Sequence, residues 1–236
     1  MKSISRIFFQ VDLTDFCRQN IIPELQKPNV DEMPVLKAAA VKYIMTFRSQ
    51  MPTDVIKGCL PLIIKHLKAQ SHVTHSYAAA TIDKILLLKI QGSNNVPVIN
   101  ASDLSPMASE LLEGLFGAFT LPGMYVFLRE IKMYFFASLF FVKSSLKSGF
   151  FLGSAENEYV MRSIMRTFSC LQEQVMPFLA TCLPVLTQKL ELAAKNPTKP
   201  HFNHYLFEAL SLSIRIVCTS QPTAVSNFEQ VLFPGK

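Results

Sequence analysis

Two pairs of histidines come closest in this chain to the spacing of a metal site. His201 and His204 stand at i and i+3 where a helix is expected to begin, so both imidazoles could face one side of it. A zinc site needs three or four ligands. The next cysteine, Cys218, lies fourteen residues along the same helix, roughly 21 Å away at 1.5 Å per residue. His72 and His75 lead to the same conclusion, and we predict no metal site.

Other residue patterns that could support catalysis are also missing. Glu156 and Glu158 are two positions apart, so on a helix they would not face each other, and acids in a first helical turn are the simpler interpretation. The sequence holds no GxSxG elbow, GxGxxG loop, P-loop or HExxH motif. We therefore predict no catalytic residue, no cofactor and no enzymatic activity. Five widely spaced cysteines without a CxxC pair suit free thiols in a reducing compartment: Cys17, Cys59, Cys170, Cys182 and Cys218.

The composition indicates buried helix pairs. Half of the 236 residues are hydrophobic, 17% are charged, and the eight glycines are too few for a turn-dense β-sandwich. The net charge of +6 could suggest nucleic acid. However, residues 124–153 hold four basic residues and one acidic residue, which gives +3, and the other +3 is scattered. We predict no nucleic-acid binding.

A repeat is visible in the prolines. Each lies beside apolar residues in a helix-like stretch, at Pro23, Pro61, Pro106 and Pro177, with spacings of 38, 45 and 71. Subtracting the thirty residues 124–153 from the last spacing leaves 41. A period near forty with proline in the first helix of each unit is typical of a HEAT-type array.

Apolar residues at helical spacing fall between these prolines. One stripe is Leu36, Ala40, Tyr43, Ile44 and Phe47, and others follow within 78–85, 161–171 and 202–216. The stripes predict four antiparallel helix pairs that stack and share a core. The expected pairs are 12–27 with 34–50, 54–69 with 72–90, 103–120 with 156–172, and 174–194 with 201–219, followed by a helix near 222–233.

Two segments stand out from a generic helical array, at 154–169 and 196–208. The second holds two prolines, two histidines and three aromatic residues in thirteen positions. Together they resemble the central part of the exportin-2 family of importin-alpha re-exporters. Further matching segments between Asp12 and Phe233 are Asp12–Phe16, Asn20–Leu25, Pro34–Lys37, Lys42–Met45, Ser76–Ala79, Leu121–Gly123 and Ser213–Arg215.

The resemblance implies an all-α HEAT-repeat solenoid of the importin-beta superfamily. It also implies a nuclear export receptor that shuttles between nucleus and cytoplasm and binds importin-alpha together with RanGTP. The chain lacks the family's N-terminal repeats, where the main Ran-binding surface lies, and most of its C-terminal arch. We therefore transfer no partner-binding residue to this sequence and expect the chain alone to bind these partners weakly or not at all.

The resemblance divides the chain into three parts. Residues 12–123 correspond to the central HEAT region, 124–153 form an insertion, and 154–233 continue the repeats. The insertion is predicted to be a translated intron. The codons of Gly123–Val126 can contain GTATGT, a splice donor, and those of Phe150–Gly153 can contain TTAG, a splice acceptor. Both sites would fall one base into a glycine codon, so excision would restore a single glycine. Its longest uncharged run, Met133–Val142, has ten residues, and a spanning helix needs about twenty. We predict no membrane insertion, although a helix on a membrane surface is an alternative.

Two functional hypotheses stay open at this point. In the first, the chain is a segment of an export receptor whose surface serves a protein partner. In the second, it is a structural fragment, or the product of an incorrect gene model, without binding activity of its own.

Overall fold

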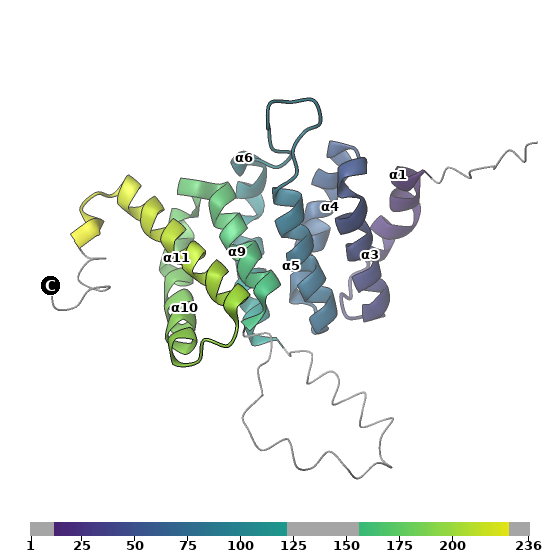
Figure 1. Cartoon of the computed structure of the whole chain (residues 1–236). Coiled ribbons are helices and arrows are strands. Elements are labelled where there is room, and N and C mark those ends of the chain that lie inside the picture. Colours follow the sequence, from purple (N-terminus) through teal and green to yellow (C-terminus); the bar gives the residue numbers. More distant parts are fainter. Residues whose placement is uncertain (1–11, 122–155, 227–236) are drawn as a thin grey trace, which may run out of the picture.

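The computed structural model describes residues 12–121 and 156–226, and within them the chain is a row of stacked helices (Figure 1). The predicted all-α architecture is confirmed for this part of the chain. The predicted insertion 124–153 lies outside the described residues, as does most of the helix expected near 222–233.

The helices form two layers. We call the first the A layer; it holds α1 (Leu13–Phe16), α2 (Ile22–Gln26), α4 (Thr53–Lys65), α6 (Ala101–Leu104), α7 (Ala108–Gly117) and α10 (Met176–Lys195). The B layer holds α3 (Pro34–Phe47), α5 (His72–Leu86), α9 (Glu158–Leu171) and α11 (Pro200–Ser220). Short π or 3-10 turns extend these helices at Cys17–Ile21, Arg48–Gln50, His66–Lys68, Ser105–Met107, Ala118–Thr120 and Gln172–Val175.

In the four pairs, α2 packs on α3, α4 on α5, α6 and α7 on α9, and α10 on α11, which confirms the predicted pairing. Along the B layer, α3 packs on α5, α5 on α9, and α9 on α11. The four repeat prolines all lie in the A layer. Pro23 follows the π turn Cys17–Ile21, and Pro177 follows the 3-10 turn Gln172–Val175, so both stand where the helical hydrogen-bond pattern changes. Pro106 lies in the 3-10 turn Ser105–Met107. Pro61 lies inside α4.

The predicted apolar stripes supply the core between the layers. The residues of the three later stripes are buried, among them Ile82, Phe168 and Leu206, which are fully buried. This burial of apolar surface against both neighbours explains why the helices form a stack and not separate pairs. The core is continuous from Cys17 in the first pair to Ile216 in the last.

The first stripe is wrong at one position. Leu36 is 44% exposed, whereas the adjacent Lys37 is fully buried. The Lys37 ammonium lies 3.0 Å from Oε1 of Glu24 and donates to the Glu24 carbonyl oxygen. A buried cation is tolerated only with such partners. The acid on α2 therefore provides a partner for a buried lysine at a position that hydrophobicity alone would not place in the core.

Candidate functional site

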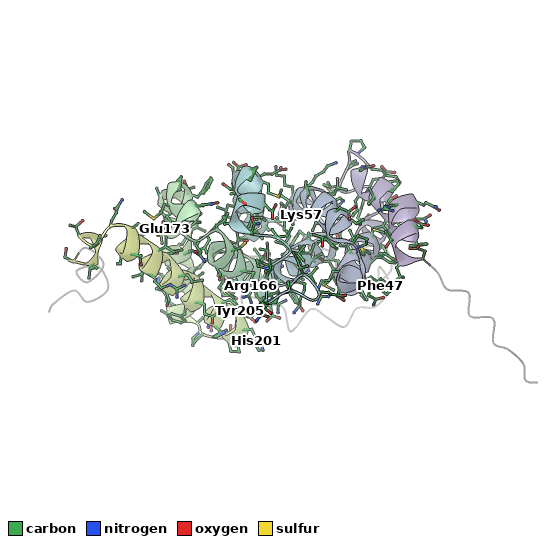
Figure 2. The ribbon with its side chains drawn as sticks, turned by 90° about the horizontal axis from the view of Figure 1, so that it is seen from above. Phe47, Lys57, Arg166, Glu173, His201 and Tyr205 are labelled. Carbon is green, nitrogen blue, oxygen red and sulfur yellow. The ribbon has the colours of Figure 1, made fainter. Side chains whose placement is uncertain are left out.

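The outer surface of the B layer carries a groove. Figure 2 shows Phe47, Arg166, Tyr205 and His201 along the B-layer side of the stack, with Lys57 and Glu173 along the opposite side. The groove has a volume of about 390 Å³ and runs over α5 between α3 and α9. Its lining residues are Met45, His72, Val73, Ser76, Tyr77, Ala80, Lys84, Tyr159 and Arg162.

Asn157 fixes the side of the groove that α9 forms. Its Oδ1 accepts from the backbone N–H of Tyr159 at 3.0 Å, which caps the first turn of α9. Its Nδ2 donates to Oγ of Ser76 on α5 at 2.7 Å, in a buried position. One side chain therefore both starts α9 and holds it against α5. Asn157 and Ser76 belong to segments that carried the family resemblance.

A buried carboxylate ties the two helices together further along. Asp83 on α5 is 1% exposed, and its Oδ1 accepts from Nε of Arg166 at 3.2 Å. Its Oδ2 lies 3.1 Å from Nε of Arg162, in an ion-pair contact without hydrogen-bond alignment. Lys84 approaches the same carboxylate at 4.0 Å. One negative charge thus faces three positive ones.

Aromatic rings hold the cations of this surface. The Arg162 guanidinium lies 5.6 Å from the ring centroid of Tyr159 and 5.7 Å from that of Tyr205 on α11. The Lys42 ammonium lies 5.7 Å from the centroid of Tyr77. These are cation–π distances, and they restrict the side chains to few rotamers. The two segments singled out in the sequence, 154–169 and 196–208, therefore meet at Arg162.

The groove is a positively charged, aromatic and apolar surface. Lys84 and Arg162 contribute cations, and the described residues that line the groove include no acid. Burial lowers the pKa of His72, so its imidazole is neutral at pH 7. Such a surface can bind an anionic group and an apolar group side by side, which is a binding chemistry.

The histidine pairs of the sequence analysis do not assemble into a larger cluster. His201 and His204 are exposed, and Nε2 of His204 lies 3.6 Å from Oε1 of Glu208. The rings of His72 and His75 meet edge to face at 5.3 Å, and Nδ1 of His75 donates to the Ala69 carbonyl at 2.9 Å. Burial lowers the pKa of His75 to about 4. Across the described ranges no three histidine, cysteine or acidic side chains come together as a metal site would require.

The remaining sequence candidates are dispersed. All five cysteines are free thiols, with Cys17, Cys59 and Cys182 buried. Glu158 begins α9, which agrees with its interpretation as a first-turn acid. Asp83 was not among the residues predicted from the sequence. An acid within the apolar stripe of 78–85 is nevertheless a detectable signal, because such a residue is rarely buried without a partner.

Comparisons with known proteins cover nearly the whole chain. A family model described as CAS/CSE protein, C-terminus, matches residues 83–235, and one described as Cse1 matches residues 2–82. Exportin-2 of Drosophila melanogaster is 46% identical over 224 residues, which is 95% of this chain and 20% of the relative. Exportin-2 of Homo sapiens is 44% identical over 223 residues, 94% of this chain and 20% of the relative. The chain thus spans about a fifth of the length of these relatives.

The fold has a counterpart among solved structures. The exportin Cse1 in its cargo-free, cytoplasmic state superposes with a TM-score of 0.58 at 24% identity, over 92% of this chain and 20% of the other. Among the described residues, no helix has the length and apolar character needed to cross a membrane. The family models together with the level of identity show that the chain belongs to the CAS/CSE protein family.

Proposed function

We propose that this chain is a segment of a nuclear export receptor. In the full-length receptor, the solenoid would bind importin-alpha together with RanGTP in the nucleus and release both in the cytoplasm. The observation that carries the proposal is the 46% identity to an Exportin-2 over 95% of the chain, in a fold that superposes on an exportin. The receptor would shuttle between nucleus and cytoplasm.

The role of this segment within the receptor is to present part of a continuous surface. A solenoid wraps its partners with distant repeats, so the affinity depends on many contacts made together. Residues 12–121 and 156–226 supply four helix pairs of such an array, and we expect the chain alone to bind RanGTP and importin-alpha weakly or not at all. No enzymatic step is part of the proposal.

A chimera tests the segment in its context. The matching segment of Drosophila melanogaster Exportin-2 is replaced by this chain, once complete and once without 124–153, and importin-alpha is followed in cells depleted of the endogenous receptor. A functional segment returns importin-alpha to the cytoplasm in at least one of the two versions. A receptor with the segment deleted is the negative control.

The same experiment distinguishes the proposed function from the alternative hypothesis. The product of an incorrect gene model, which does not complete the solenoid, would leave importin-alpha in the nucleus in both chimeras. A second measurement uses the isolated chain in a pull-down on immobilised RanGTP and importin-alpha. Tight, GTP-dependent capture by the chain alone would contradict the view that the partners need the whole solenoid.

A further inference from the structure

The groove on the B layer combines positive charge with apolar surface, and this combination indicates what kind of ligand it binds. We propose that it binds an acidic peptide segment of a protein partner, with one apolar side chain of the peptide seated over α5 and its carboxylates beside Lys42, Lys84 and Arg162. The inference deepens the proposed function, on which it rests for the need of a protein partner.

The shape of the groove suits a peptide side chain. Its volume of about 390 Å³ lies in the range of small ligand sites, roughly 300–1,000 Å³, and holds a few side chains, not a folded domain. Met45, Val73 and Ala80 give it apolar surface, and Val73 is 38% exposed. An exposed valine beside aromatic rings is an apolar contact point that a peptide could cover.

The charge of the groove selects an acidic partner. Lys84 and Arg162 line it, and Lys42 stands over the ring of Tyr77 at its edge. The carboxylate that contacts Arg162 and Lys84, that of Asp83, is 1% exposed and also contacts Arg166. It offers no surface to a basic peptide, whereas the cations keep capacity for further carboxylates.

The arginine of the groove is held in place before any partner arrives. Asp83 contacts Nε of Arg162, and the rings of Tyr159 and Tyr205 lie 5.6 and 5.7 Å from its guanidinium carbon. Among the described residues, Arg162 contacts the carboxylate through Nε, and no hydrogen bond is seen to its two terminal amino groups. These groups form the fork that binds a carboxylate with two parallel hydrogen bonds. A fixed arginine loses little rotamer freedom on binding, which favours affinity.

Fluorescence anisotropy with the complete 236-residue chain tests the proposal. The probe is a fluorescein-labelled peptide in which glutamates flank a central leucine and phenylalanine, and the control peptide has glutamines in their place. Reversal of both exposed lysines, Lys42→Glu with Lys84→Glu, is expected to weaken binding at least about tenfold, since one exposed ion pair contributes up to roughly fivefold and reversal adds repulsion. Because only this chain is needed, the outcome is separate from that of the export experiment.

The matched control reverses two lysines of the A layer, Lys57→Glu with Lys68→Glu, whose side chains are 41% and 54% exposed. This variant has the same net charge as the groove variant, and it should bind the acidic peptide as the parent does. Equal losses in both variants, or equal binding of the glutamine peptide, would overturn the proposal. So would binding of phosphatidylserine vesicles that depends on Lys42 and Lys84 while the peptide fails to bind, because the groove would then serve a membrane surface.

Discussion

Asp83 is the residue whose replacement tests the structure of the groove most directly. Its carboxylate is buried on α5 and contacts Nε of Arg162 at 3.1 Å and Nε of Arg166 at 3.2 Å, both on α9. The change Asp83→Asn keeps the shape of the side chain and an acceptor oxygen, and it removes the negative charge. It therefore leaves two neighbouring guanidinium groups without the anion between them.

The size of the effect follows from the burial of the three groups. Removing one partner of a buried ion pair costs about 3–5 kcal/mol, because an uncompensated charge stays behind. The two arginine side chains are 21% and 27% exposed, so water can rehydrate part of their charge. We expect Asp83→Asn to lower the free energy of unfolding by about 2 kcal/mol, below the fully buried case. That is a large fraction of a stability of about 5–15 kcal/mol.

Urea denaturation followed by circular dichroism measures this loss. The matched control is Glu110→Gln, which breaks an ion pair between Glu110 and Lys68 at 3.7 Å, where both side chains are about half exposed. Such surface pairs contribute about 0–1 kcal/mol. A double-mutant cycle of Asp83→Asn with Arg166→Leu should give a coupling of at least about 0.5 kcal/mol. If Asp83→Asn costs no more than Glu110→Gln, or the cycle shows no coupling, the carboxylate does not hold α5 to α9.

Three further outcomes are expected. The free energy of unfolding should fall as the pH drops from about 6.5 toward 4, because burial lowers the pKa of His75 to about 4 and protonation then favours the unfolded chain. In urea titrations at pH 7 and pH 5, the variant His75→Gln should show a smaller difference in the free energy of unfolding. Gly114→Ala should lower the melting temperature, since a Cβ there would meet Cβ and Cδ1 of Leu67 at 3.0 Å. Gly117→Ala should raise it, because a Cβ at that position would meet nothing within 4 Å. Equal shifts in the two variants would contradict the packing of Gly114 against Leu67. Sequencing of the transcript should show that mature messenger RNA lacks the codons for 124–153, and their retention in most molecules would contradict the intron hypothesis.

The helix pairs could be predicted because each stripe repeats at the helical period and joins one core that is continuous along the stack. The spacing of the prolines also predicted the repeat length, since one of the four repeat prolines lies in the A layer of every pair. The exchange of Leu36 and Lys37 could not be predicted this way. The acid that buries Lys37 is Glu24, thirteen positions earlier on another helix, and a hydrophobic stripe contains no information about it.

The groove could not be predicted from the sequence for a related reason. Its parts are held by contacts between residues far apart in the chain, such as Asn157 with Ser76, 81 positions away, and Arg166 with Asp83, 83 positions away. Periodicity places each of these residues on a helix, but the register of one helix against the next decides whether an arginine meets a buried acid. The family resemblance pointed to the right segments without assigning a role to any residue in them.

The register between α5 and α9 also bears on the predicted insertion. In the described residues, α7 packs against α9, and Asn157 clamps the first turn of α9 to Ser76 on α5. The third helix pair is therefore joined through residues on either side of 122–155. The last spacing of the repeat prolines returns to 41 only when thirty residues are taken out, and on that spacing 124–153 stays predicted as an insertion into the array.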